Sequence, residues 1–134
     1  MKKIVITGGL GYIGTELCKI YSGYSWNDKI TIIDNRFISE RVNQIRNWNM
    51  NFIHGDILDK DLVKKYCHDA DVVHHLAGIT SVPRVKNESN TEEDKKIKLV
   101  GEQGTQNIID AIPDKCKIIM PSTHVVYEGI ENVK

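Results

Sequence analysis

The chain has 134 residues, of which 40% are hydrophobic and 27% charged, and its eighteen basic and eighteen acidic side chains cancel. This composition is ordinary for one globular domain with a buried core. The balanced charge gives no global field that would favour nucleic acid or an anionic membrane surface. No apolar run approaches the ~20 residues needed to span a bilayer. We therefore expect a domain that binds neither nucleic acid nor membrane.

The cysteine count bears on the redox compartment. Cys18, Cys67 and Cys116 are widely separated and odd in number. This usage suits buried thiols in a reducing cytosol better than a disulfide framework, so we expect a cytoplasmic protein. The sequence contains no Cys-x-x-Cys or comparable ligand spacing, and we expect no metal site.

Short apolar runs rich in β-branched residues alternate with longer amphipathic segments. The runs predict five buried strands, over residues 3–7, 29–34, 50–54, 71–76 and 117–120. Helical spacing of apolar residues predicts helices over residues 12–24, 39–47, 59–67 and 92–112. Pro113 ends the last helix, and the polar residues 86–96 around its start should be exposed and mobile.

Two of these helices carry expectations about packing. The first helix has apolar residues at helical spacing, namely Ile13, Leu17, Ile20 and Tyr21. The last helix has an expected apolar stripe of Ile97, Val100, Ile108, Ile109 and Ile112. Gly101 and Gly104 lie on or near that stripe, where missing side chains would permit close approach to a sheet.

Strands of the buried type that alternate with helices are typical of parallel strands joined by crossover helices. Right-handed crossovers then favour an α/β fold with a doubly wound parallel sheet of the Rossmann kind, about five strands in the order 3-2-1-4-5. The sequence shows neither an internal repeat nor a linker. We therefore expect one domain over residues 1–134.

Four glycines, Gly8, Gly9, Gly11 and Gly14, follow the first strand at the spacing of the dinucleotide-binding fingerprint. The pattern follows a strand, opens a helix, and is followed by Asp34 at the end of the next strand. Glycines at these positions permit a tight turn, close approach of the backbone to a pyrophosphate, and close packing of helix on strand. The alternative is a turn that merely needs glycine, in which case Asp34 is a coincidence.

Asp34 bears on the choice of cofactor. A carboxylate at this place is positioned to accept hydrogen bonds from the hydroxyl groups of the adenosine ribose. It also repels a 2′-phosphate, so NAD is favoured over NADP. Arg36 lies close enough in sequence to keep NADP open as the second choice.

The stretch from Thr7 to Gly14 closely resembles the start of the extended short-chain dehydrogenase/reductases, the family of NAD-dependent nucleotide-sugar epimerases and dehydratases. Further segments agree in order and spacing, and together they cover essentially the whole chain: Asp34-Asn35, Gly55-Asp56-Ile57, the run from His74 to Gly78, Ser81-Val82 and the run from Pro121 to Tyr127. The resemblance implies that a dozen residues contact the cofactor, namely Gly8, Gly11, Tyr12, Ile13, Gly14, Asp34, Asn35, Asp56, Ile57, Leu76, Ala77 and Gly78.

The resemblance also implies a mechanism. In this family, bound NAD removes hydride from a sugar carbon of a nucleotide-sugar while a tyrosine takes the hydroxyl proton. A lysine lowers the pKa of that tyrosine, and a Ser or Thr hydroxyl donates to the reacting oxygen. Thr123 matches this hydroxyl residue and is the one catalytic candidate in the chain. The alternative for Thr123 is a hydroxyl that satisfies loose backbone groups at a strand end.

The catalytic tyrosine and lysine of the family are expected as Tyr-x-x-x-Lys, and none of the five tyrosines of the chain is followed by lysine at that spacing. We therefore expect the chain to be the N-terminal part of a larger enzyme, truncated before the later strands and the substrate domain. It should bind NAD without turnover. Gly101 also stands where the family usually carries an asparagine, which puts part of the active-site hydrogen bonding in doubt.

Other readings stay open. His74 and His75 are adjacent in a strand and point to opposite faces, so they cannot chelate one metal together, and we expect them to pack near the cofactor. The parent enzyme is alternatively a reductase or decarboxylase of the same family. A non-catalytic module that senses a dinucleotide is a further alternative. The sequence leaves open whether the full-length enzyme forms a homodimer.

Overall fold

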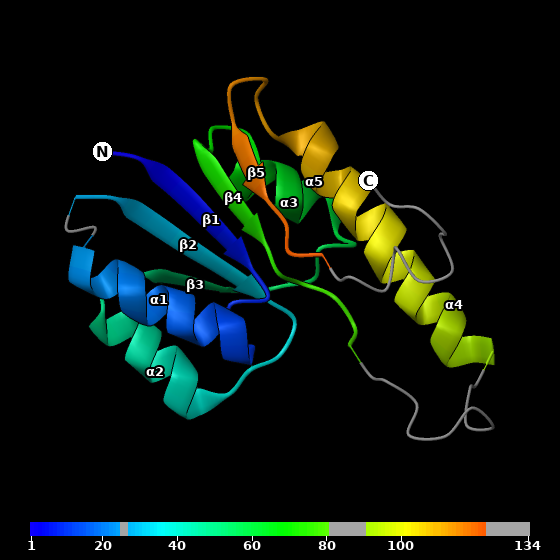
Figure 1. Cartoon of the computed structure of the whole chain (residues 1–134), viewed down its shortest axis with the longest axis horizontal. Helices are drawn as coiled ribbons and strands as arrows, with labels where there is room; N and C mark the ends of the chain where they lie inside the picture. The colour runs from blue at the N-terminus through cyan, green and yellow to red at the C-terminus, as the bar shows by residue number, and fades with distance from the viewer. Residues whose placement is uncertain (25–26, 81–90, 123–134) are drawn as a thin grey trace, which may run out of the picture.

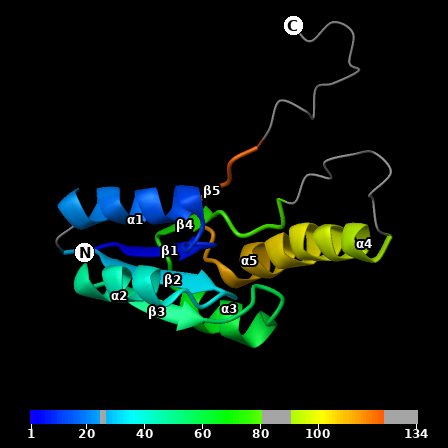
Figure 2. The same ribbon diagram turned by 90° about the horizontal axis from the view of Figure 1, so that it is seen from below.

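The structure is a computed structural model that describes residues 1–24, 27–80 and 91–122. The strands are β1 (Lys3–Thr7), β2 (Lys29–Asp34), β3 (Asn51–His54), β4 (Val72–His75) and β5 (Lys117–Ile119). The helices are α1 (Tyr12–Tyr24), α2 (Ser39–Asn47), α3 (Lys60–Cys67), α4 (Thr91–Leu99) and α5 (Thr105–Ala111). A π-helical turn, Val100–Gly104, joins α4 to α5, so that the three segments form one rod (Figure 2).

The strands form one parallel sheet in the order β3-β2-β1-β4-β5, which confirms the predicted doubly wound arrangement (Figure 1). Because all strands are parallel, their carboxyl ends meet at one edge of the sheet. The loop after β1 and the loop after β4 leave from neighbouring strands at this edge. In an open α/β sheet, this is where ligands bind.

The sheet has an apolar core on each face. On one face, α1 and α2 cover alternate residues of β1 and β2, and the buried members are Ile4, Ile6, Leu10, Cys18, Ile30, Ile32, Val42, Ile45 and Met50. On the other face, α3 and α5 cover the intervening residues, and the buried members are Val5, Ile33, Ile57, Val63, Cys67, Ala70, Val73 and Ile108. This alternation is the period-2 pattern of strands buried on both sides.

The three cysteines are free, as expected from their number. Cys18 and Cys67 are fully buried, one in each core, and Cys116 is half-buried. Burial raises the pKa of the Cys18 and Cys67 thiols to about 12, so both are inert, apolar packing groups.

The predicted apolar stripe of α1 is wrong in part. Ile13 and Ile20 are 67% and 56% exposed, whereas the buried residues of the helix are Gly14 and Cys18. The reason is the close approach of α1 to the sheet through Gly14. That contact fixes how α1 is rotated about its axis. Ile13 and Ile20 each stand one position before a residue of the helix face that packs on the sheet, so their side chains point outward.

The predicted stripe of the last helix is also wrong in part. Ile109 is 49% exposed, and a Cβ on Gly101 would meet nothing within 4 Å. Gly104 does make the expected close approach, which is to the side chain of Ile57 rather than to a strand. The π-helical turn accounts for the difference, because it adds a residue to one turn and rotates the face that follows.

The contact at Gly14 predicts the outcome of a matched pair of substitutions in α1. A Cβ on Gly14 would lie 2.5 Å from the Gly8 carbonyl oxygen and 2.6 Å from Gly9 Cα, both backbone atoms. We expect Gly14→Ala to lower the free energy of unfolding by about 1–3 kcal/mol, measured by urea denaturation. Gly23→Ala, which meets nothing within 4 Å in the same helix, should raise it by up to about 1 kcal/mol. Equal shifts in the two variants would contradict the contact.

Candidate functional site

The glycine turn after β1 is fitted between the ends of two neighbouring strands. Gly8 has a φ of +70°, which favours glycine, and its N–H donates to the Ile33 carbonyl oxygen at 2.8 Å. A Cβ on Gly8 would lie 2.7 Å from the Ala77 backbone nitrogen, and one on Gly9 would collide with the Ile32 side chain. Packing within the protein therefore explains the glycines at positions 8 and 9.

Gly11 differs from these positions. The nearest atoms to a Cβ on Gly11 are the Gly8 carbonyl oxygen at 3.3 Å and a terminal nitrogen of Arg36 at 3.8 Å. Tyr12 and Ile13, which begin α1, are 85% and 67% exposed. The first N–H groups of a helix have no carbonyl one turn earlier to bond, and they carry partial positive charge. This turn therefore offers the helix N–H groups of an exposed helix start to an anion such as a pyrophosphate.

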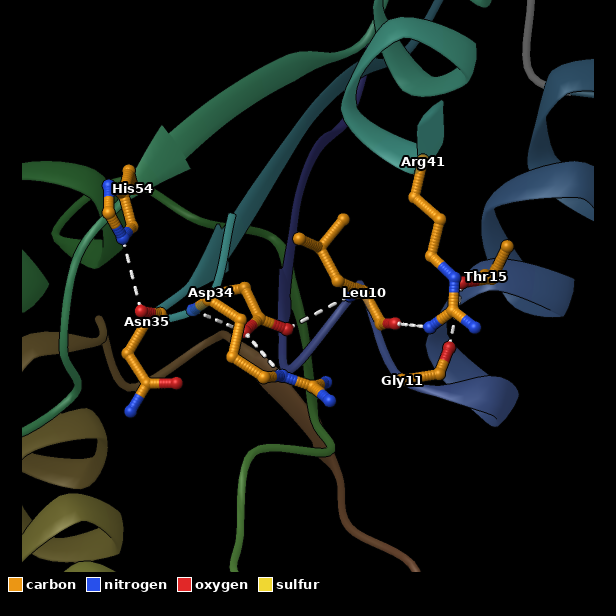
Figure 3. Close-up of polar contacts among 8 residues, drawn as sticks. Leu10, Gly11, Thr15, Asp34, Asn35, Arg41 and His54 are labelled. Atoms are coloured by element: carbon orange, nitrogen blue, oxygen red, sulfur yellow. Dashed lines mark hydrogen bonds and ion pairs between the residues drawn. The ribbon is translucent and has the colours of Figure 1, made fainter. Parts of the chain in front are cut away.

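Asp34 connects the end of β2 to the glycine turn. Its side chain is buried, at 3% exposure, and Oδ2 accepts the Leu10 N–H at 3.0 Å (Figure 3). Oδ1 accepts the backbone N–H of Arg36 at 2.9 Å and its Nε–H at 3.3 Å. The carboxylate is thus fixed beside the turn, with acceptor capacity left for a hydroxyl group. Arg36 stands two residues after Asp34, which brings its Nε–H within reach of the carboxylate and forms the ion pair.

Arg41 of α2 supports the same turn from the other side. Its guanidinium donates to the Leu10 carbonyl oxygen (Figure 3). The same group lies 5.5 Å from the centre of the Tyr12 ring. The Thr15 hydroxyl donates to the Gly11 carbonyl oxygen at 2.7 Å. The sequence gives no signal for Arg41, because it lies 31 residues from Leu10 and outside any motif.

The remaining predicted cofactor residues lie at the same edge, after β2, β3 and β4. Asn35 is exposed, and its carbonyl oxygen pairs with His54 Nε2 at 3.0 Å. Asp56 Oδ1 accepts the Leu58 N–H at 2.9 Å, which fixes the turn after β3. The carbonyl oxygen of buried Ile57 accepts from Asn107 Nδ2 at 2.9 Å.

Asn107 was missed in the sequence, where a polar residue inside an apolar stripe gave no reason to expect burial at 3% exposure. After β4, the backbone N–H of Leu76 donates to the Thr7 carbonyl oxygen at 3.1 Å, and Gly78 is exposed. The structure thus brings the twelve predicted residues to one edge, and their contact with a cofactor stays a prediction. Thr123 lies outside the described residues, as do Ser81, Val82 and Tyr127.

His74 and His75 point to opposite faces of the sheet, as predicted. His74 Nε2 lies 2.7 Å from the Tyr21 hydroxyl of α1, with the two rings edge to face. Burial lowers the pKa of His74, and the charge of Lys117 adds to this effect. Within the part of the chain that the structure describes, no group of three or more His, Cys, Asp or Glu residues could hold a metal ion.

His75 joins β1, β4 and α5 through hydrogen bonds. Its Nδ1 lies 2.8 Å from Thr7 Oγ1, and its Nε2 lies 3.0 Å from Thr105 Oγ1. Because Thr7 Oγ1 already accepts the Ala77 N–H at 3.2 Å, we assign the Thr7 hydroxyl as the donor to Nδ1. Nε2–H then donates to Thr105. Burial lowers the pKa of His75, which keeps the ring in the neutral form that this arrangement needs.

A parallel sheet ordered 3-2-1-4-5, with a glycine turn and a carboxylate at neighbouring strand ends, is the arrangement of the Rossmann fold, a fold that commonly binds dinucleotides. The model of the 3-beta hydroxysteroid dehydrogenase/isomerase family matches residues 5–130. The chain belongs to this family, and its resemblance to the extended short-chain dehydrogenase/reductases is confirmed.

The relatives include sugar-nucleotide enzymes. The chain is 33% identical to a UDP-N-acetyl-alpha-D-glucosaminuronate decarboxylase of Bacillus cytotoxicus, over 94% of this chain and 38% of the relative. It is 32% identical to a CDP-paratose 2-epimerase of Salmonella typhi, over 98% of this chain and 40% of the relative. The crystal structure of UDP-glucose 4-epimerase from Brucella ovis in complex with NAD superposes with a TM-score of 0.74 at 25% identity, covering 99% and 39% of the two chains.

The chain therefore spans about two fifths of the length of these relatives. Every helix among the described residues is too short or too polar to cross a lipid bilayer.

The buried histidines predict how stability depends on pH. The unfolded chain binds protons at its histidines near the ordinary pKa of 6.5, whereas burial lowers the pKa of His75 and His74 in the folded chain. The unfolded state therefore binds more protons below that pH, and the free energy of unfolding should fall as the pH is lowered from 7 to 5. Urea denaturation across this range measures the slope. His75→Gln should make the slope shallower, and Gln44→Ala, an exposed change without a titratable group, should keep it. An unchanged slope in His75→Gln would contradict this account.

Proposed function

We propose that this chain is the NAD-binding portion of a nucleotide-sugar epimerase or dehydratase. The observation that carries the proposal is the turn at Gly11, where the N-terminus of a helix lies beside the fixed carboxylate of Asp34. An added Cβ at Gly11 would make one tight contact, 3.3 Å from the Gly8 carbonyl oxygen, whereas at Gly8, Gly9 and Gly14 it would collide with atoms within 2.7 Å. The relatives that act on sugar nucleotides support the substrate class.

Each part of the cofactor has residues suited to it. The pyrophosphate approaches the backbone at Gly11 and accepts hydrogen bonds from the N–H groups of Tyr12 and Ile13, which lie at the positive end of α1. The Gly11 N–H itself already donates to the Gly8 carbonyl oxygen at 3.1 Å. Asp34 accepts hydrogen bonds from the adenosine ribose. Asp56 then accepts the exocyclic amine of adenine.

The remaining predicted residues complete the lining. Asn35 and Ile57 lie on the adenosine side, and Leu76, Ala77 and Gly78 line the nicotinamide side. These assignments rest on the positions of the residues after β2, β3 and β4 and on the resemblance to the family.

The charge at Asp34 favours NAD over NADP. A 2′-phosphate carries negative charge, and a buried carboxylate beside the ribose repels it. The Arg36 side chain already donates its Nε–H to Asp34 Oδ1 at 3.3 Å, and the Arg36 backbone N–H donates to the same oxygen, so the guanidinium offers less of its charge to a phosphate. The epimerase from Brucella ovis, whose structure holds NAD, supports this choice.

When bound, NAD supplies a hydride acceptor for a carbon of the sugar. The chain's own contribution to the chemistry is the Thr123 hydroxyl, which we propose donates a hydrogen bond to the reacting oxygen. The full-length enzyme takes a nucleotide-sugar as its substrate. The full-length enzyme is either a homodimer or a monomer.

Decarboxylation of a nucleotide-sugar is the second candidate for the parent enzyme. The relative from Bacillus cytotoxicus, a UDP-N-acetyl-alpha-D-glucosaminuronate decarboxylase that is 33% identical to this chain, favours it. Both reactions need the same dinucleotide edge, so the cofactor proposal holds for either.

A substitution at Gly11 tests cofactor binding separately from folding. Gly11→Ala places a methyl group in one tight contact, 3.3 Å from the Gly8 carbonyl oxygen, so the free energy of unfolding should fall by about 1 kcal/mol or less, a smaller loss than in Gly14→Ala. The same methyl group covers the surface proposed for the pyrophosphate. We expect NAD affinity, measured by calorimetry, to fall at least about tenfold, which corresponds to about 1.4 kcal/mol.

Gly23→Ala, which lies at the far end of the same helix in open space, is the matched control and should bind NAD like the wild type. The wild-type chain should also bind NAD more tightly than NADP in parallel titrations. Tighter binding of NADP would overturn the cofactor choice, and full NAD affinity in Gly11→Ala would overturn the proposed site.

We further propose that the 134-residue chain does not turn over a nucleotide-sugar by itself. Its sequence contains no Tyr-x-x-x-Lys, and it spans about two fifths of its relatives. UDP-glucose incubated with the purified chain and NAD should therefore show no epimerisation by chromatography. Product formation that scales with the concentration of the chain would contradict this proposal.

A further inference from the structure

A hollow of about 200 Å³ lies at the amino-terminal end of the sheet, opposite the edge that carries the glycine turn. Lys3, the first residue of β1, belongs to its lining, and β1 begins near the N-terminus marked in Figure 1. The lining of the hollow comes from three strands, from the end of α3 and from the residues just after α3, namely Lys3, Ile4, Val5, Lys29, Thr31, Asn51, Lys65, Tyr66, His68 and Asp69.

The strand register explains why polar residues meet here. Lys3 pairs with Lys29, Val5 pairs with Thr31, and Thr31 pairs with Asn51, so neighbouring strands present these side chains in two adjacent rows. All five have odd positions in the sequence. They therefore share the face of the sheet that α3 and α5 cover farther along.

Thr31 is the buried polar residue of the lining. The residue is 6% exposed, and among the described residues its hydroxyl has no hydrogen-bond partner. The described residues also contain no fully enclosed side-chain oxygen or nitrogen that lacks a partner. The Thr31 hydroxyl therefore opens into the hollow that the residue lines.

The charge of the lining is positive. Three lysines face one carboxylate, and Lys3 pairs with that carboxylate, Asp69. Within the described part of the chain, Lys29 and Lys65 have no acidic partner, and Lys65 Nζ lies 5.2 Å from the centre of the Tyr66 ring. The other carboxylate nearby, Asp71, accepts the backbone N–H of Lys3 at 2.9 Å. Two ammonium groups are thus left to attract an anion.

We propose that this hollow binds the phosphoryl group of a small phosphorylated molecule. Lys29 and Lys65 supply the charge, and the Thr31 hydroxyl and the Asn51 amide supply hydrogen-bond donors. The volume is below the roughly 300–1,000 Å³ of sites for drug-sized ligands, which matches a phosphate ester of a few carbon atoms and excludes a dinucleotide. The site is separate from the proposed NAD site, because it lies at the other end of the strands.

Amide chemical shifts of the isotope-labelled full chain test the proposal. The probes are inorganic phosphate and glycerol 3-phosphate, with sodium chloride at matched ionic strength as the reference. Saturable shifts should gather at residues 29–31, at Asn51 and at residues 65–69. Tighter binding of glycerol 3-phosphate identifies an organic ester as the ligand, and equal binding identifies free phosphate.

Substitutions of the lining locate the site. Lys29→Gln and Lys65→Gln should each weaken phosphate binding about two- to fivefold, as expected for charges near the surface. Thr31→Val keeps the shape of the side chain and should weaken binding about three- to tenfold through loss of the donor. Lys64→Gln is the matched control, because Lys64 lies on the same helix and outside the lining.

Several outcomes would overturn the proposal. Shifts confined to residues 8–15 would assign the anion to the glycine turn. Shifts that sodium chloride reproduces would show that the phosphate acts only by screening charges and does not bind. A loss in Lys64→Gln equal to that in Lys65→Gln would show a diffuse charge effect. Thermal unfolding by circular dichroism verifies that each variant folds. If Thr31→Val fails to fold, unchanged phosphate binding in both lysine variants would still overturn the proposal.

Discussion

The hydrogen bond from the Leu10 N–H to the buried carboxylate of Asp34 is the contact on which the candidate site depends. Removing an ion from water costs several kcal/mol unless it is paired and hydrogen-bonded. Here the Leu10 N–H and two N–H groups of Arg36 offset that cost. The carboxylate in turn pins the glycine turn to the end of β2. One side chain therefore fixes both the acceptor that we propose for a ribose and the backbone that we propose faces the pyrophosphate.

The hydrogen bonds of His75 extend this organisation to the other half of the sheet. Thr7 ends β1 just before the glycine turn, and its hydroxyl links the Ala77 N–H after β4 to His75 Nδ1. The opposite ring nitrogen reaches Thr105 of α5, which follows the π-helical turn. π-helical turns often occur at functional sites, where they redirect side chains. In this chain the turn places Gly104 against Ile57 and brings Thr105 within reach of His75.

The strand order and the glycine turn were predictable from the sequence, because buried parallel strands and close backbone approach leave local patterns. The rotation of the helices was not. Ile13 and Ile109 fit apolar stripes but are exposed, since a contact at Gly14 and a π-helical turn decide which face is buried. Hydrogen bonds between residues far apart in the chain, such as that from Arg41 to the Leu10 carbonyl oxygen, were equally unpredictable from the sequence. Tertiary packing determines such partners, and no regular spacing of residues in the sequence indicates them.

The glycines separate what the fold requires from what a ligand requires. At Gly8 and Gly14 an added Cβ would meet backbone atoms within 3 Å, so the turn itself excludes larger residues there. At Gly11 the nearest protein atom is 3.3 Å away, and the fold makes only a mild demand. The fold thus excludes a side chain less strictly at Gly11 than at Gly8 and Gly14, and an exposed helix N-terminus and a fixed carboxylate lie beside it. This combination, more than the fingerprint as a whole, supports the proposed dinucleotide site.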